Sequence, residues 1–317
     1  MPVHPALQAM CDAAGQAPPP TPMTSDERVA LLRATVETFG SLGAGTPDPM
    51  YGVDDHFPDG PHGPIPLRVY RPTNGTGAPL VIYFHGGGFV SGSVEAWDGT
   101  CRRIAKAAGA VVVSVDYRLA PEHRFPIPLD DCHAALAWAV ANAADFGADG
   151  TRVAVAGDSA GGNLAAAVAL RSRVEGPALR AQVLVYPVIS PKCATPSMDE
   201  NGEGYLLTAS AMREMWAWYL GPDGDANDAF AAVDTAADYT GLPPAIVLTA
   251  EYDPLRDEGE HYASVLDGFD VDTTALRYDG MLHGFLGMRE IVPEADQAVA
   301  AIAAFLRARL GPSPRPR

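Results

Sequence analysis

The sequence predicts a doubly wound α/β fold, in which helices cover both faces of a mostly parallel sheet. Two observations support this. Short runs of the chain are apolar at nearly every position, and helical patterns alternate with them. Strands that are apolar on both faces are what a parallel sheet between two helix layers requires. The repeated order of strand then helix is typical of this fold class.

The first element that the sequence predicts is an amphipathic helix, "TSDERVALLRATVETFG", ahead of the main domain. Thr24 and Glu27 have the spacing of a capping box, and Gly40 is the expected stop. The apolar residues of this helix fall on one stripe: Val29, Leu32, Val36 and Phe39. We therefore expect this helix to lie against the main domain.

The strands and helices of the sheet domain follow in alternation. The expected strands are 67–72, 79–88, 110–117, 152–159, 181–188, 244–253 and 271–280. The expected helices are 100–109, 130–147, 161–176 and 294–311. Residues 194–240 break this rhythm with a helix, "GYLLTASAMREMWAWYLG", which carries Trp216 and Trp218. A helix placed between two core strands in this way is expected to be an insertion that lies over the sheet.

Composition excludes several classes of function. The chain of 317 residues carries a net charge of −17, which disfavours binding to nucleic acid or to an anionic membrane surface. The first residues lack the pattern of a signal peptide, and no apolar run approaches the roughly 18 residues of a membrane span. The four cysteines form no CxxC pair, which favours reduced thiols. We expect a cytoplasmic protein without nucleic-acid or membrane partners.

A serine lies in an unusual turn where the strand 152–159 ends, within "VAVAGDSAGGNL". Gly157, Ser159 and Gly161 fit the pattern G-x-S-x-G, with a strand before it and a helix after it, which is the context of a nucleophile elbow. A serine at the start of a helix also gains the positive end of the helix dipole. The pattern therefore predicts Ser159 as a nucleophile.

A second strand, 79–88, ends in "HGGGF", residues 85–89. Consecutive glycines leave backbone N–H groups open to a ligand oxygen, as the stabilisation of an oxyanion requires. A flexible loop or a phosphate cradle is the alternative, but neither a GK[ST] nor a GxGxxG pattern is present. His85 precedes the serine in the chain, and we expect it to shape this loop.

A serine nucleophile needs a base, and the base needs an acid that orients it. Asp253 follows the strand 244–253, and His283 lies in the loop before the last helix, so the chain order is Ser, Asp, His. Three other carboxylates compete for the role of the acid: Glu251, Asp257 and Glu258. We expect Asp257 and Glu258 to be solvated on a helix. Asp279 is expected to be a turn residue.

Five motifs together resemble the hormone-sensitive lipase family of carboxylesterases, in the bacterial branch with a GDSAGG elbow. The motifs are HGGGF (85–89), DYRLAPEHRFP (116–126), GDSAGGN (157–163), EYDPLRDEG (251–259) and HGF (283–285). The resemblance runs from about residue 50 to 310. It implies a triad of Ser159, Asp253 and His283. The oxyanion donors that it implies are the N–H groups of Gly86, Gly87 and Ala160.

The resemblance also implies the α/β-hydrolase fold, with a catalytic domain and a cap. A catalytic domain is expected from residues 51–189 and 241–317, with a helical cap made of residues 1–50 and 190–240. We expect substrate contacts from four further side chains: Phe89, Asp158, Tyr186 and Trp216. The segment Tyr117–Pro126 has no chemistry of its own and is expected to brace the HGGG loop.

The function expected from these residues is hydrolysis of short- to medium-chain carboxylic esters through an acyl-enzyme. The substrate is a small molecule, and neither a metal nor an organic cofactor is implied. An amidase or lactonase with the same triad is an alternative, and a non-catalytic ligand-binding protein on this fold is a second. The sequence leaves a homodimer open, through pairing of an exposed last strand.

Overall fold

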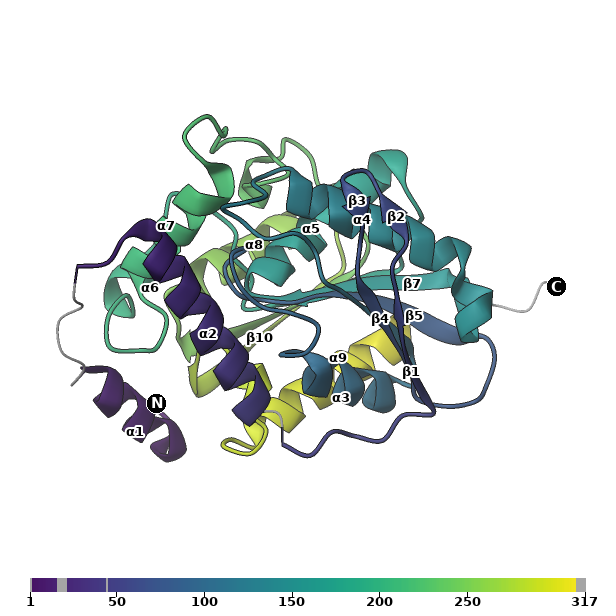
Figure 1. Ribbon diagram of the computed structural model, residues 1–317, viewed down its shortest axis with the longest axis horizontal. Coiled ribbons are helices and arrows are strands. Elements are labelled where there is room, and N and C mark those ends of the chain that lie inside the picture. The colour runs from purple at the N-terminus through teal and green to yellow at the C-terminus, as the bar shows by residue number, and fades with distance from the viewer. Residues whose placement is uncertain (1, 16–21, 44, 312–317) are drawn as a thin grey trace.

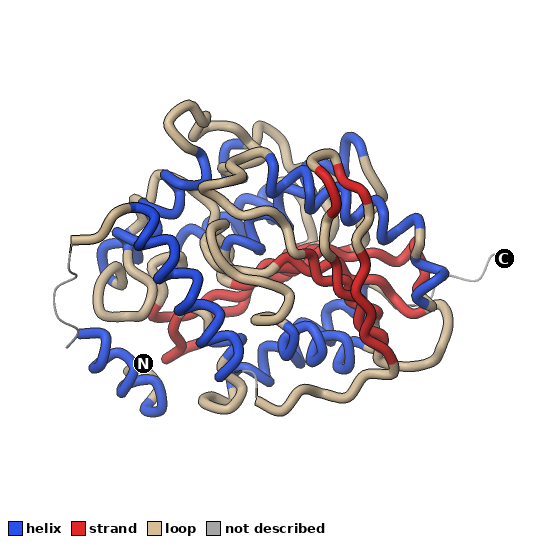
Figure 2. Tube along the Cα trace, viewed as in Figure 1, coloured by secondary structure: helices blue, strands red, loops and turns tan. Residues whose placement is uncertain are grey.

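A twisted sheet of eight strands runs through the centre of the protein, between two layers of helices (Figure 1; Figure 2). The structure is a computed structural model that describes residues 2–15, 22–43 and 45–311. The strand order in the sheet is β1-β4-β6-β5-β7-β8-β9-β10. The ladders from β6 to β10 are parallel, and β4 is antiparallel to both of its neighbours. The prediction of a mostly parallel, doubly wound sheet is confirmed.

The strands of the central sheet occupy these residues: β1 Gly52–His56, β4 Leu67–Arg71, β5 Ala78–Phe84, β6 Val111–Val115, β7 Ala148–Asp158, β8 Ala181–Val185, β9 Ala245–Tyr252 and β10 Thr273–Leu282. A small hairpin pairs β2 Asp59–Gly60 with β3 Gly63–Pro64. The helices are α1 Pro5–Gly15, α2 Ser25–Gly43, α3 Asp98–Ala108, α4 Ile127–Ala141, α5 Ala160–Glu175, α6 Pro196–Glu200, α7 Ala209–Leu220, α8 Arg256–Gly268 and α9 Glu294–Arg309.

Two apolar cores lie on the two faces of the sheet. On one face, β5–β9 pack against α4, α5 and α8, with buried side chains such as Leu136, Leu164 and Leu266. On the other face the sheet packs against α3 and α9, through side chains such as Ile104 and Ile302. Figure 2 shows helices above and below the strands. This arrangement explains why the runs of the central strands are apolar at every position.

The expected N-terminal helix is present as α2, with its predicted capping box. The Thr24 N–H donates to Glu27 Oε2 at 2.8 Å, and the Glu27 N–H donates to Thr24 Oγ1 at 3.3 Å. The helix continues through Gly40 to Gly43, so the predicted stop is wrong. A Cβ at Gly40 would lie only 2.7 Å from the Cβ of Ala96, so this glycine permits close packing. Phe39, assigned to the apolar stripe, is 53% exposed.

Two further boundaries differ from the prediction. The strand β1 was not expected, because apolar and polar residues alternate poorly in "GVDDH". It lies at the edge of the sheet, where it pairs with β4. The inserted helix α7 begins at Ala209, whereas the sequence placed its start near Gly204. Thr208 explains that start, because its hydroxyl accepts the N–H of Ala211 at 3.1 Å and caps the helix.

Helix α2 lies across the body beside α7, as Figure 1 shows. The Trp218 Nε1–H of α7 donates to Ser25 Oγ at 2.8 Å, and Arg28 pairs with Glu214 at 2.7 Å. Arg33 donates to the carbonyl oxygen of Val90, just beyond the HGGG segment, at 2.8 Å. The N-terminal region and the insertion therefore contact each other directly. No helix in the described part of the chain is both long and apolar enough to span a membrane.

Candidate active site

The turn between β7 and α5 holds Ser159 in a strained backbone conformation. Its φ of 55° and ψ of −122° are unusual for a residue with a side chain. An added Cβ at Gly157 would overlap the carbonyl oxygen of Gly161, and one at Gly161 would overlap that of Phe84. The glycines on both sides of the serine are therefore required by close backbone approach, as a nucleophile elbow demands.

The backbone of Ser159 is fixed from the neighbouring strand. Its N–H donates to the carbonyl oxygen of Val185 at 2.8 Å, and its carbonyl oxygen accepts the N–H of Val188 at 3.1 Å. The side chain stands at the N-terminus of α5, and the residue is 6% exposed. The hydroxyl therefore lies at the carboxyl edge of the sheet, close to unpaired helix N–H groups.

The structure brings together the three residues that the sequence predicted as a triad. His283 follows the end of β10, and Asp253 follows the end of β9. The His283 Nε2 lies 3.0 Å from Ser159 Oγ, and His283 Nδ1 lies 2.7 Å from Asp253 Oδ2. Asp253 is fully buried, and its second oxygen, Oδ1, accepts the N–H of Leu255 at 2.9 Å.

This geometry fixes the roles that the imidazole nitrogens can take. A carboxylate only accepts hydrogen bonds, so Nδ1 carries a proton and donates a hydrogen bond to Asp253. The unprotonated Nε2 then accepts the hydroxyl proton of Ser159. The arrangement can therefore remove a proton from the serine and hold the resulting imidazolium beside a buried negative charge.

The HGGG segment after β5 is shaped by His85 and Tyr117. The imidazole of His85 is buried and stacks on the ring of Tyr117 at a centroid distance of 4.3 Å. Burial lowers the pKa of His85 to about 4, so this side chain is neutral near pH 7. The Tyr117 hydroxyl donates to the carbonyl oxygen of His85 at 2.8 Å, and the Ala120 N–H donates to that of Phe89 at 2.9 Å. The segment that begins at Tyr117 braces this loop, as predicted.

Gly86 and Asp158 do not have the roles that the sequence suggested. The Gly86 N–H donates to Asp158 Oδ1 at 3.1 Å, and is thus engaged within the protein. The same oxygen accepts the Tyr83 hydroxyl and the Trp97 Nε1–H, both at 2.8 Å. Asp158 is 4% exposed, so it connects the elbow to the HGGG loop and does not face a substrate. Burial raises its pKa to about 6, although these hydrogen bonds oppose the shift.

The remaining N–H groups of the loop are differently placed. Gly87 and Gly88 have φ values of 112° and 64°, which favour glycine. Among the described residues, no hydrogen bond given by the structure uses the N–H of Gly87, Gly88 or Ala160. Within the described residues, these three amides thus keep their hydrogen-bonding capacity for an oxygen of a substrate. The pattern HGGG could not indicate which of its glycines serves the protein's own hydrogen bonds.

Three other residues expected near the substrate lie in aromatic clusters. Phe89 stacks on Tyr219 of α7 at 3.9 Å and lies 5.3 Å from the ring of Trp216. Trp216 is 3% exposed, and a contact with substrate remains a prediction for both it and Phe89. The ring of Tyr186 packs 4.7 Å from that of His283. Tyr186 is only 2% exposed, which favours a supporting position behind the imidazole over the expected substrate contact.

The rival carboxylates lie elsewhere. The Glu251 carboxylate accepts the N–H of Gly280 at 2.7 Å, and Asp257 accepts that of Ser197 at 2.8 Å. Glu258 was expected to be solvated, and that expectation is wrong, because it is 3% exposed. Burial, together with the nearby Asp253 and Asp234, raises the pKa of Glu258 to about 8. No set of three or more His, Cys, Asp or Glu side chains in the described ranges is arranged to hold a metal ion.

Comparison with known proteins finds relatives of this chain among ester hydrolases. Residues 81–287 match a protein family described as having the alpha/beta hydrolase fold. The carboxylesterase NlhH of Mycobacterium tuberculosis is 43% identical over 251 residues, which are 77% of this chain and 78% of that protein. The ethyl acetate hydrolase of Pseudomonas putida is 38% identical over 252 residues, 78% of this chain and 79% of that protein.

A solved structure extends the likeness over nearly the whole chain. The hyperthermophilic esterase of the archaeon Pyrobaculum calidifontis superposes with a TM-score of 0.89 at 42% identity. The match covers 97% of this chain and 99% of that one. The fold and the sequence thus agree with those of a group of ester hydrolases.

Proposed function

Since the chain belongs to the hormone-sensitive lipase family of carboxylesterases, within the α/β-hydrolase superfamily, we propose that Ser159, His283 and Asp253 are its catalytic triad. The chain is a serine hydrolase of carboxylic esters. The observation that carries the assignment is the pair of distances from the imidazole, 3.0 Å to Ser159 Oγ and 2.7 Å to Asp253 Oδ2.

The reaction then follows from the positions of these groups. Ser159 Oγ forms a bond to the acyl carbon of the ester while His283 takes its proton. The bond from the acyl carbon to the alcohol oxygen breaks, and the alcohol leaves with that proton. Water then attacks the acyl-enzyme, giving its proton to the imidazole, and the acid is released as the proton returns to Ser159.

The oxyanion of each tetrahedral intermediate needs donors that are free. We assign this role to the N–H groups of Gly87, Gly88 and Ala160, with Gly88 in place of Gly86. Support comes from the engagement of the Gly86 N–H by Asp158, at 3.1 Å. One such donor is typically worth about 2.7–4 kcal/mol in the transition state.

The proposed substrates are esters of short- to medium-chain acids. Two observations support this choice. Aromatic side chains of α7 pack on Phe89, which directly follows the proposed oxyanion donors, so bulky side chains border this loop. A relative 38% identical to the chain is named as an ethyl acetate hydrolase.

The cap is proposed to comprise residues 1–50 and 190–240, over a catalytic domain of residues 51–189 and 241–317. The contacts of α2 with α7 and with Val90 support this division. Part of the proline-rich segment "GQAPPPTPM" lies outside the described residues. A homodimer through the exposed edge of β10 and a cytoplasmic location both remain predictions.

The assignment is tested with Ser159→Ala and p-nitrophenyl butyrate. Loss of a triad serine typically lowers the rate by about 10⁶-fold, so the variant should be inactive. A variant that hydrolyses the ester at near the parent rate would show that the triad is wrongly assigned. A series of p-nitrophenyl esters from acetate to palmitate tests the substrate class, and a maximum at palmitate would contradict it.

A further inference from the structure

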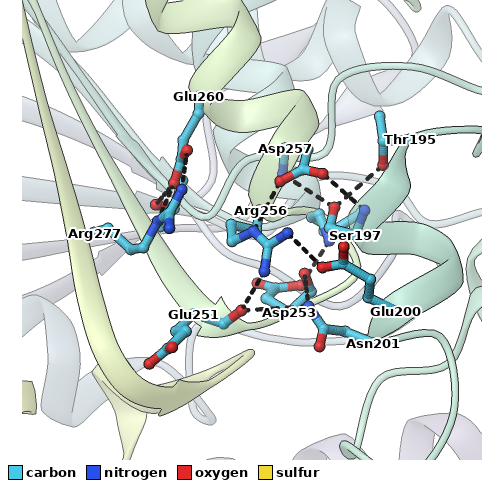
Figure 3. Close-up of polar contacts among 12 residues, drawn as sticks. Thr195, Ser197, Glu200, Asn201, Glu251, Asp253, Arg256, Asp257, Glu260 and Arg277 are labelled. Carbon is cyan, nitrogen blue, oxygen red and sulfur yellow. Dashed lines mark hydrogen bonds and ion pairs between the residues drawn. The ribbon is translucent and has the colours of Figure 1, made fainter. Parts of the chain in front are cut away.

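We infer that the segment Thr195–Asn201, inserted after β8, positions the acid of the triad, and that Asn201 is its principal positioning residue. The inference rests on the proposed function, because it concerns how Asp253 is held toward His283. We call residues 251–256, which run from the last residues of β9 to the first residue of α8, the acid loop. Figure 3 shows the inserted segment beside this loop.

The side-chain amide of Asn201 spans the backbone around the acid. Its Nδ2 donates to the carbonyl oxygens of both Glu251 and Asp253, at 3.3 Å each. These carbonyl groups lie two residues apart, one before the acid and one on the acid itself. Asn201 is 4% exposed, so water cannot readily replace its amide. A single side chain from a distant part of the sequence therefore fixes where the acid loop lies.

Ser197 holds the other end of the acid loop. Its hydroxyl donates to the carbonyl oxygen of Pro254 at 2.8 Å and accepts the N–H of Asp257 at 3.1 Å. The Ser197 N–H donates in return to Asp257 Oδ2 at 2.8 Å. Ser197 is fully buried, and Figure 3 shows these contacts between α6 and the start of α8. The segment thus binds both the loop and the helix that follows it.

The turn that contains Asp253 does not by itself set the distance between the Asp253 carboxylate and the imidazole of His283. The Leu255 N–H orients the carboxylate within the loop, but His283 comes from the end of a different strand, β10. The 2.7 Å contact between Asp253 and His283 therefore depends on the position of the whole acid loop. Asn201 and Ser197 supply contacts that set this position from outside the loop.

The same insertion reaches the oxyanion loop through α7. The carbonyl oxygen of Gly202 accepts the Ala209 N–H at 2.9 Å, which joins the end of the segment to the start of α7. Further along α7, Met215 packs so closely on Gly88 that an added Cβ there would overlap its sulfur. A displacement of the insertion would thus act on both the acid loop and the proposed oxyanion donors.

The test uses Asn201→Ala and Asn201→Asp in the full chain, with Asn227→Ala as the matched control. Asn227 is an exposed asparagine of the same insertion, and among the described residues its side-chain amide donates to Asp225 alone. All rates are divided by the concentration of reactive serine, titrated to completion with a fluorophosphonate. We measure kcat and KM on p-nitrophenyl butyrate.

Both Asn201 variants should lower kcat by about 10- to 100-fold with little change in KM, because a shift of about 1 Å in a catalytic group can cost that much. Since each rate refers to reactive serine, a fall in kcat at constant KM reports a misplaced acid and not a loss of folded protein. A purely structural loss would reduce the amount of active enzyme and leave kcat per reactive serine unchanged. Asn227→Ala should match the parent in both measurements.

The outcomes separate this inference from the proposed function. An active Ser159→Ala variant would overturn the function itself. An inactive Ser159→Ala variant, with Asn201 variants that keep the parent kcat, would overturn only the positioning role. If Asn201→Ala does not fold, Asn201→Asp and Ser197→Ala decide, and parent-like values in both would overturn the inference.

Discussion

The nucleophile elbow and the acid loop both place one side chain of the triad at a strand end, but they hold it by different means. The elbow is fixed by backbone geometry and by backbone hydrogen bonds to the neighbouring strand and the loop after it. Ser159 has a φ of 55°, and the flanking glycines leave no space for side chains. The acid loop has no comparable constraint. Buried side chains from other segments, Asn201 and Ser197, donate to its carbonyl groups instead.

A similar tie links the start of α8 to the loop after β8. Glu258 Oε1 accepts the N–H of Ile189 at 2.7 Å, and Ile189 is next to Val188, whose N–H donates to the carbonyl oxygen of Ser159. The acid side of the site therefore depends on side-chain hydrogen bonds over a long sequence separation. The elbow should tolerate changes in distant side chains, and the acid loop should not.

The largest effect is expected from a methyl group within the elbow. In Gly161→Ala the added Cβ would overlap the carbonyl oxygen of Phe84, so the turn must shift. We expect at least about a 100-fold loss of kcat/KM, since displacement of a nucleophile by about 1 Å costs that much. Gly268→Ala is the control, because its Cβ would meet no atom within 4 Å. Parent-like activity in Gly161→Ala would show that side-chain contacts, and not backbone clearance, set the elbow.

The next largest effect is expected where the elbow itself depends on a side chain. Asp158→Ala removes the shared acceptor of the Tyr83, Trp97 and Gly86 donors. Each buried donor left without a partner costs about 1–3 kcal/mol, and the oxyanion loop loses its tie to the elbow. We expect kcat to fall by roughly 10- to 100-fold, which is less than the loss of one whole oxyanion donor costs, because the donors are displaced but still present.

Asp158→Asn provides the comparison, because it keeps an acceptor oxygen of the same size. Its kcat should lie between those of the parent and Asp158→Ala. Steady-state kinetics on p-nitrophenyl butyrate would measure both. Equal kcat in all three proteins would mean that the HGGG loop keeps its position without this carboxylate.

The contrast between the two regions explains what the sequence could reveal. The elbow was predicted because its constraint is local: five consecutive residues, Gly157 to Gly161, carry the steric requirement. The positions of Asp253 and His283 were predicted from their strand ends. Asn201 and Ser197 were not found, because nothing in "TPSMDEN" indicates that it lies beside a loop 50 residues further along the chain.

The same reason accounts for the errors at Gly86 and Glu258. The repeated glycines of HGGG are equivalent in the sequence, and only the approach of Asp158 distinguishes the first of them. Glu258 lies in a charged stretch, "RDEGEH", that resembles a solvated helix. Its burial follows from packing of α8 on the loop after β8, and helical periodicity does not include that contact.

Titration of Glu258 should make the stability of the acid side depend on pH. Its pKa is raised from 4.5 to about 8 by burial, so between these values the folded state holds a proton that the unfolded state has lost. The free energy of unfolding therefore falls as pH rises through this window, by up to about 1.4 kcal/mol per pH unit. Glu258→Gln cannot ionise and should lose less stability from pH 5 to pH 8.

Urea unfolding of the parent and of Glu258→Gln at pH 5 and pH 8 would measure this difference, which should be on the order of a few kcal/mol at pH 8. The exposed Glu203→Gln is the control and should follow the parent. If Glu258→Gln loses as much stability as the parent over the same pH range, the buried carboxyl does not hold its proton in the folded state.

The smallest effect is expected at Glu200, an exposed residue that contacts the acid loop. It separates the effect of buried hydrogen bonds from that of exposed ion pairs. Glu200 pairs with Arg256 at 2.8 Å, but its side chain is 58% exposed, so water and salt screen the pair. Exposed ion pairs contribute about 0–1 kcal/mol, and Arg256 also donates to the carbonyl oxygen of Glu251 at 3.1 Å. Glu200→Gln should therefore change kcat by less than about twofold. Kinetics at low and high salt would measure this. A loss as large as that of Asn201→Ala would show that the exposed charge of Glu200, and not the buried amide of Asn201, positions the acid loop.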